Sequence, residues 1–250
     1  MKTKLSLFIS IGLGLFACLA LLPSLRAQDG AAPVAKAERG AQREPGYLDP
    51  QSVDYASVVP PVPTAGSIAD MTDFETLLRV QGTRTPADEK WANVILKADA
   101  FSNADIIGAW FKADTLPATV ALLKKSGADA NAVTNVAKDF YKRTRPYVVS
   151  KEIKPCVAIP GGYSYPSGYA MQVFVRAGVL AALFPDKGPE LLAKARANAW
   201  ARIVGGVHYP SDVVAGRLLA KLVVEDLLKN PDFQADLEKA RAEAGSLSGK

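Results

Sequence analysis

Side chains that commonly bind metals or form disulfides are scarce in this sequence. Its 250 residues include one histidine, His208, and two cysteines, Cys18 and Cys156. A zinc ion takes about four Cys, His or carboxylate ligands, so we expect no zinc site. Cys18 lies in an N-terminal segment that we expect to be removed, which leaves Cys156 without a partner for an internal disulfide. The folded state should therefore depend on its hydrophobic core.

Long apolar runs are absent after the N-terminal segment. The run over residues 5–22 follows Lys2 and Lys4 and precedes Arg26 and Ala27. A basic start, an apolar stretch and a small-residue cleavage point predict an export signal cut near Ala27. The protein is then expected to be periplasmic or secreted from a bacterium, with no membrane span in the mature chain. An uncleaved membrane anchor is the alternative.

A strong excess of charge of one sign is also missing. The chain has 30 Lys and Arg against 25 Asp and Glu, a formal net charge of +5. Three basic residues and no acidic residue lie within residues 1–27, so about +2 remains after signal removal. A nearly balanced chain without interleaved basic and aromatic positions is not expected to bind nucleic acid.

Alternating strand patterns are absent from the chain, and the periodicity from Ser67 onward is helical. The Pro-rich residues 28–66 are typical of an extended arm or linker. We therefore predict an export signal over residues 1–27, an arm over 28–66 and one all-α, single-domain helical bundle over 67–250. Prolines, glycines and capping residues predict helices over residues 86–96, 117–127, 130–144, 167–184, 189–204, 211–228 and 231–245.

The single histidine lies in the stretch A-R-I-V-G-G-V-H-Y-P-S-D. Arg202 precedes His208 by six residues and Asp212 follows it by four. Neutral imidazole can act as a nucleophile or base near neutral pH, and a carboxylate can fix which ring nitrogen carries the proton. A guanidinium supplies a planar fork of donors for a phosphate or carboxylate. These residues are candidates for catalysis, although this stretch alone leaves a packing or surface role open.

A second candidate segment reads K-D-F-Y-K-R-T-R-P. Lys138 and Arg145 lie seven residues apart, which is nearly two helical turns, so they share one face. We interpret the intervening Lys142 and Arg143 as solvated charges at a helix C-terminus, where cations are favoured.

A third segment, Y-P-S-G-Y, contains the start of a predicted helix. Ser167 supplies a hydroxyl, and Gly168 lets an anion approach the free backbone N–H groups of the first turn. A simple helix cap is the alternative for this segment taken alone.

The three motifs occur in the order Lys-x6-Arg-Pro, Pro-Ser-Gly and Arg-x5-His-x3-Asp. This order resembles the signature of the phosphatidic-acid phosphatase type 2 superfamily. Within it, the chain is most similar to the exported class A bacterial non-specific acid phosphatases, over roughly residues 46–244. The matching residues are Lys138, Arg145, Pro146, Pro166, Ser167, Gly168, Arg202, His208 and Asp212.

The resemblance implies the all-α fold of these phosphatases and of vanadium haloperoxidases. It also implies a phosphoric monoester hydrolase that needs no metal or other cofactor and works through a phosphohistidine on His208, with Asp212 holding the other ring nitrogen. The implied partners are small phosphate monoesters and inorganic phosphate, and a homo-oligomer is left open. The residues implied to bind the phosphoryl group are Lys138, Arg145, Arg202, Ser167 and Gly168.

The sequence departs from the family pattern at Tyr169 and Ala201. The family has histidine at the first position, as the acid that protonates the leaving oxygen, and usually serine at the second. A phenol has a reference pKa near 10, so we expect Tyr169 to be a weak catalytic acid. A working but weakened enzyme is then one hypothesis. A degenerate phosphate-binding protein and a vanadate-dependent haloperoxidase are the alternatives.

Overall fold

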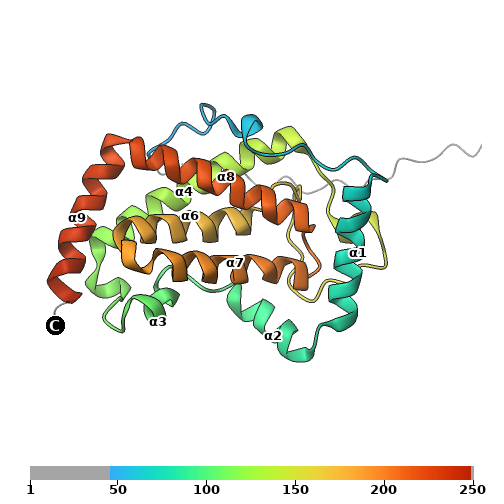
Figure 1. Cartoon of the computed structure of the whole chain (residues 1–250), viewed down its shortest axis with the longest axis horizontal. Coiled ribbons are helices and arrows are strands. Elements are labelled where there is room, and N and C mark those ends of the chain that lie inside the picture. Colours follow the sequence, from blue (N-terminus) through green and yellow to red (C-terminus); the bar gives the residue numbers. More distant parts are fainter. Residues whose placement is uncertain (1–45, 249–250) are drawn as a thin grey trace, which may run out of the picture. The chain divides into compact units, whose positions relative to one another are not determined.

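The computed structural model describes residues 46–248, which belong to one compact unit, Ala35–Lys250 (Figure 1). The predicted export signal, its cleavage point and most of the predicted arm lie outside the described residues. Within these residues the regular elements are all helices, which confirms the predicted all-α class. The α-helices are α1 (Ile68–Thr83), α2 (Pro86–Ile95), α3 (Ala104–Ile107), α4 (Pro117–Tyr141), α5 (Pro146–Val149), α6 (Gly168–Leu183), α7 (Gly188–Val204), α8 (Pro210–Lys229) and α9 (Pro231–Ser248).

Capping residues explain where several helices begin. Thr85 caps α2, as predicted: its hydroxyl accepts from the Asp88 backbone N–H at 3.2 Å, and Asp88 accepts from the Thr85 N–H at 2.8 Å. Ser67 caps α1 through its hydroxyl alone, which accepts from the Asp70 backbone N–H at 3.2 Å. The predicted bounds of α6, α7 and α8 are confirmed within a residue or two.

The prediction that a helix stops at Gly127 is wrong. Helix α4 runs unbroken through this glycine, and the Gly127 carbonyl accepts a hydrogen bond from Gln172 of α6 at 2.9 Å. One glycine in a helix costs about 1 kcal/mol relative to alanine, which buried packing of residues such as Leu122 and Val133 outweighs. The helix also ends earlier than predicted, because Lys142 adopts a left-handed conformation with φ of 49°.

Helix α6 forms the centre of the bundle and packs against α4, α7 and α8 (Figure 1). Its apolar residues are buried on a wide face, as expected of a central helix. In the described part of the chain, no helix is long and apolar enough to cross a membrane. Large, fully buried side chains of this core include Met171, Leu180, Leu219, Leu122 and Phe233.

Close approach between α6 and α8 brings two of the sequence motifs together. A Cβ atom on Gly216 of α8 would lie only 2.5 Å from the Ser167 carbonyl oxygen, so glycine permits this contact. The Ser167 N–H donates to the Asp212 carbonyl at 2.9 Å. The start of α6 is thereby held beside the start of α8.

Candidate active site

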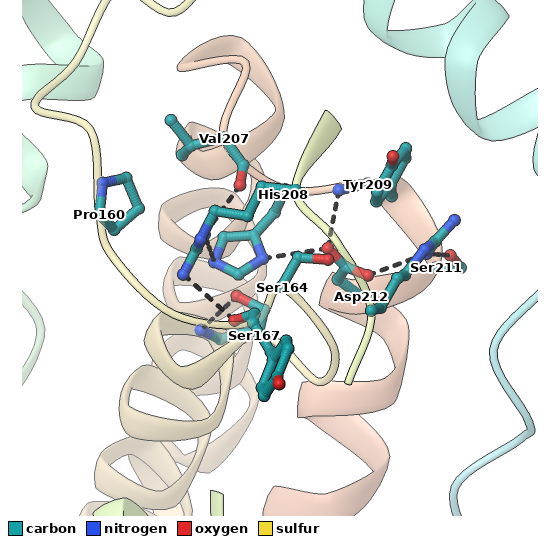
Figure 2. Close-up of polar contacts among 12 residues, drawn as sticks. Pro160, Ser164, Ser167, Val207, His208, Tyr209, Ser211 and Asp212 are labelled. Carbon is teal, nitrogen blue, oxygen red and sulfur yellow. Dashed lines mark hydrogen bonds and ion pairs between the residues drawn. The ribbon is translucent and has the colours of Figure 1, made fainter. Parts of the chain in front are cut away.

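The single histidine lies in the short loop between α7 and α8, which Gly206 bends with a φ of +69°. His208 is 2% exposed, and its Nδ1 lies 3.1 Å from Asp212 Oδ2. Its Nε2 lies 3.2 Å from Arg145 Nη1. Because arginine can only donate, Nε2 must accept, and the ring proton must be on Nδ1, facing the carboxylate. Figure 2 shows the His208 ring facing the Asp212 carboxylate.

The electrostatic surroundings keep this imidazole neutral. Burial lowers the pKa of His208 to about 3, although the hydrogen bond and charge of Asp212 act in the opposite direction. The positive charges of Arg145 and Lys138 lower the pKa further. An unprotonated Nε2 is therefore available as a nucleophile at acidic and neutral pH.

Asp212 occupies the first turn of α8 and is completely buried. Burial alone would raise the pKa of its carboxyl group, but the hydrogen bond with His208 and the Arg143 guanidinium hold that pKa below its usual value. The Tyr209 backbone N–H also donates to Oδ2 at 2.9 Å. An ionised carboxylate thus faces Nδ1 and can stabilise a positive charge that develops on the ring.

Arg145 is fixed by backbone carbonyls rather than by carboxylates. It donates to Val207 from Nη1 at 2.9 Å, to Gly162 from Nε at 2.9 Å and to Gly161 from Nη2 at 3.0 Å. Lys138 Nζ donates to the Tyr163 carbonyl in the same loop. Neutral acceptors leave the positive charge of both side chains uncompensated.

The sequence motif Lys-x6-Arg therefore supplies two neighbouring cations. Burial, followed by the charge of Arg145, lowers the pKa of Lys138 to about 7, while Asp212 acts in the opposite direction. Because burial and the neighbouring cation disfavour the charged form of Lys138, a bound anion would stabilise its ammonium group.

Arg202 lies in the last turn of α7 and is 6% exposed. Its Nε is buried and has no hydrogen-bond partner among the described residues. Burial, and next the charge of Arg145, lower the pKa of Arg202 to about 10. A buried, orphaned donor next to other cations is suited to a phosphate oxygen, which can accept several charge-assisted hydrogen bonds.

Ser167 and Gly168 lie where α6 begins, as predicted. Ser167 is fully buried, and its hydroxyl accepts from the Ala170 N–H at 3.3 Å. A Cβ on Gly168 would lie 3.3 Å from Thr134 Cγ2 and 3.8 Å from Lys138 Cε. The glycine therefore relieves a tight contact with Thr134, and the lysine side chain lies close to the helix N-terminus, where backbone N–H groups favour anions.

The Tyr169 hydroxyl contacts the backbone of helix α2. Its hydroxyl donates to the Ile95 carbonyl, at the end of α2, at 2.9 Å. The Arg202 guanidinium carbon lies 5.5 Å from the ring centroid. Burial raises the pKa of this phenol above its ordinary value, against the charges of Arg176 and Arg202. The Tyr169 ring therefore lies beside Arg202, and the phenol hydrogen is engaged in a hydrogen bond to a backbone carbonyl.

The interpretation of Arg143 as a solvated charge is wrong. The residue is 8% exposed and forms ion pairs with Asp212 Oδ1 at 2.9 Å and Asp73 Oδ2 at 2.8 Å. Its neighbour Lys142 is exposed, as expected. Asp212 and Asp73 are 69 and 70 residues away from Arg143 in sequence, and a third partner, Asp70 at 3.4 Å, is 73 residues away, so no local pattern predicts these contacts.

The part of the chain that contains this site matches a known family model. Residues 119–225 match the PAP2 superfamily. The chain is 29% identical over 207 residues to a non-specific acid phosphatase of Providencia stuartii, covering 79% of this chain and 83% of that protein. It is 29% identical over 226 residues to a non-specific acid phosphatase of Salmonella typhi, covering 84% and 88%.

Solved structures share the fold. A transmembrane PAP2-type phosphatidylglycerolphosphate phosphatase from Bacillus subtilis superimposes with a TM-score of 0.50 and 22% identity, covering 68% of this chain and 89% of that one. A bacterial vanadium-dependent iodoperoxidase gives a TM-score of 0.53 and 18% identity, covering 69% and 53%. These likenesses confirm the predicted fold type.

Proposed function

The chain contains a PAP2 superfamily domain over residues 119–225, and from this premise we propose that it is an acid phosphatase that hydrolyses phosphate monoesters through a phosphohistidine on His208. The observation that carries the proposal is the buried imidazole, whose Nε2 faces Arg145 while Nδ1 faces an ionised carboxylate. Relatives named non-specific acid phosphatases support the reaction class.

Substrate binding would use the uncompensated cations. The phosphoryl oxygens accept hydrogen bonds from Lys138, Arg145 and Arg202, and the Ser167 hydroxyl and Gly168 N–H complete the set. Phosphoryl transfer depends mainly on positioning and on neutralising charge at three equatorial oxygens. Three cations and a helix N-terminus supply both.

The reaction would proceed in two displacements. His208 Nε2 attacks phosphorus, the phosphorus–nitrogen bond forms and the bond to the leaving oxygen breaks. Asp212 stabilises the imidazolium-like ring of the intermediate. A water molecule then attacks phosphorus and loses a proton to the solvent, which balances the proton taken up by the leaving oxygen. The phosphorus–nitrogen bond breaks, inorganic phosphate is released and the neutral imidazole is restored.

Protonation of the leaving oxygen is the weak step of this scheme. The Tyr169 proton is used by the Ile95 carbonyl, and the pKa of the phenol is raised. General-acid assistance contributes about 10²–10⁴-fold to rate, so alkyl phosphates should react slowly. Aryl phosphates, whose leaving oxygen needs little protonation, should react much faster.

Export is part of the proposal. The basic and apolar order of residues 2–22, followed by Arg26 and Ala27, supports a signal that is removed near Ala27. The mature protein would then act in the bacterial periplasm or outside the cell. Labelling of the N-terminus of the secreted protein would locate the cleavage point.

Steady-state hydrolysis tests the function. The wild-type protein should hydrolyse p-nitrophenyl phosphate with a metal chelator present, and His208→Ala should not. Phosphate binding without turnover would instead favour the degenerate phosphate-binding alternative. Iodide oxidation that requires added vanadate and peroxide would favour the haloperoxidase alternative.

A further inference from the structure

Asp212 is held by a buried cluster on the side of its carboxylate that faces away from the imidazole. Its Oδ2 accepts from His208 and the Tyr209 N–H, while Oδ1 accepts from Arg143 Nη1 at 2.9 Å. Both oxygens of the catalytic carboxylate are therefore fixed. Ser211 and Asp212 lie next to each other on the first turn of α8 (Figure 2).

Arg143 is itself held between two buried carboxylates. Its Nη2 donates to Asp73 Oδ2 of α1 at 2.8 Å, and the side chains of both residues are 6% exposed. The Tyr209 ring lies 3.6 Å from the guanidinium carbon. Ser211 Oγ accepts from Nη1 at 2.7 Å. This arrangement uses the planar fork of arginine, which the single ammonium of lysine cannot reproduce.

Asp73 also secures the helix that carries Asp212. Its Oδ1 accepts from the Ser211 backbone N–H at 3.0 Å, and its Oδ2 accepts from the Ser211 hydroxyl. A carboxylate at a helix N-terminus is favoured by the helix dipole. Helix α1, which carries none of the residues that would bind phosphate, thus reaches the active site through Asp73, and Asp70 Oδ1 of the same helix lies 3.4 Å from Arg143 Nη2.

The connector between α4 and α5 contacts the histidine–aspartate pair at both ends. Arg143 binds Asp212 Oδ1, and two residues later Arg145 binds His208 Nε2. The first contact orients the carboxylate, and the second faces the nucleophilic nitrogen. One short segment therefore sets the direction of both partners.

We propose that Arg143, held by Asp73, is a positioning residue that orients Asp212 and through it the ring of His208. Rotation of the Asp212 carboxylate would break the Arg143 contact, so the fork keeps Oδ2 directed at Nδ1. The proposal refines the phosphatase scheme and rests on it for the kinetic measurements alone. Its spectroscopic test needs no turnover.

The experiment compares Arg143→Gln, Arg143→Lys and Asp73→Asn with the wild-type protein. The chain has one histidine, so ¹⁵N-histidine labelling of untagged protein gives one imidazole in the spectrum. In the wild type the proton should be on Nδ1. Arg143→Gln should keep this tautomer, because Arg145 still donates to Nε2, but the Nδ1–H bond to Asp212 should weaken and its proton resonance should move upfield. It should also lower kcat about 10–100-fold with KM changed less than about two-fold, as expected for a group that acts from behind a catalytic side chain.

Arg143→Lys should lower kcat less than Arg143→Gln does, because lysine keeps the positive charge but lacks the planar fork. Asp73→Asn should lower kcat by about 10-fold for the same reason, and it decides the matter if Arg143→Gln does not fold. Arg84→Gln is the matched control, since Arg84 is a mostly buried guanidinium that pairs with Glu89 at 2.8 Å. It should lower thermal stability without changing kcat or the Nδ1–H resonance.

A folded Arg143→Gln protein with the wild-type Nδ1–H resonance and kcat would overturn the proposal. So would a loss of activity that only follows the folded fraction in all three variants. If the wild type hydrolyses no phosphate ester, the proposed function fails, while the Nδ1–H resonance of the folded variants still decides whether Arg143 positions the pair.

Discussion

The depressed pKa of Lys138 predicts the alkaline limit of activity. The ammonium must be charged to bind a phosphoryl oxygen, and burial together with Arg145 and Arg202 lowers the pKa of Lys138 to about 7, with only Asp212 opposing. The catalytic efficiency kcat/KM should therefore fall as the pH rises through about 7. On the acidic side, His208 stays neutral down to a pKa of about 3, so the favourable window is acidic to neutral.

Replacement of Lys138 by arginine isolates this effect. With a pKa of about 7, the charged fraction of the lysine falls roughly 20-fold between pH values of about 6.5 and 8.5. The wild-type kcat/KM for p-nitrophenyl phosphate should fall by that factor, whereas arginine stays charged and Lys138→Arg should lose less than about two-fold. The ratio is taken within each protein, so any loss of absolute rate cancels.

Lys142→Arg provides the matched control, because Lys142 is the exposed lysine at the end of the same helix. Its pH profile should coincide with that of the wild type. An alkaline limb that persists near pH 7 in Lys138→Arg, or that lies near the ordinary lysine pKa of about 10 in the wild type, would refute the reasoning.

Two further substitutions test other parts of the site. Tyr169→His should raise the rate on alkyl phosphates by about 10-fold or more while changing the rate on p-nitrophenyl phosphate little, because it restores an acid for the leaving oxygen; equal effects on both substrates would contradict the leaving-group argument. Gly216→Ala should lower the free energy of unfolding by about 1–3 kcal/mol, since the new Cβ would lie 2.5 Å from the Ser167 carbonyl oxygen. Gly82→Ala, at a helical position with no neighbour within 4 Å, should instead raise it by about 0.5–1 kcal/mol in the same denaturation assay.

Local sequence rules predicted most of the helices because the relevant contacts are local. Thr85 and Asp88 form their capping box within one turn, and prolines mark the first turns of α2, α4 and α8. Gly127 shows where such rules fail. Whether a helix continues through a glycine depends on packing and on a hydrogen bond from Gln172 of another helix.

The distinction between local and long-range contacts also applies to the active site. The pairing of His208 with Asp212 follows from four residues of spacing at a helix start, and it could be anticipated. The role of Arg143 could not, because its burial depends on Asp73 from α1. Nor does any local pattern indicate that the Tyr169 hydroxyl contacts the Ile95 carbonyl of α2.

Rapid-quench labelling with a ³²P-labelled phosphate ester tests the central claim most directly. The wild-type protein should carry a transient, acid-labile label on His208 that reaches up to about one equivalent per chain and turns over, as expected of a covalent intermediate. His208→Ala should carry none. Turnover by the wild type with no label at any quench time, or equal labelling of His208→Ala, would contradict the account.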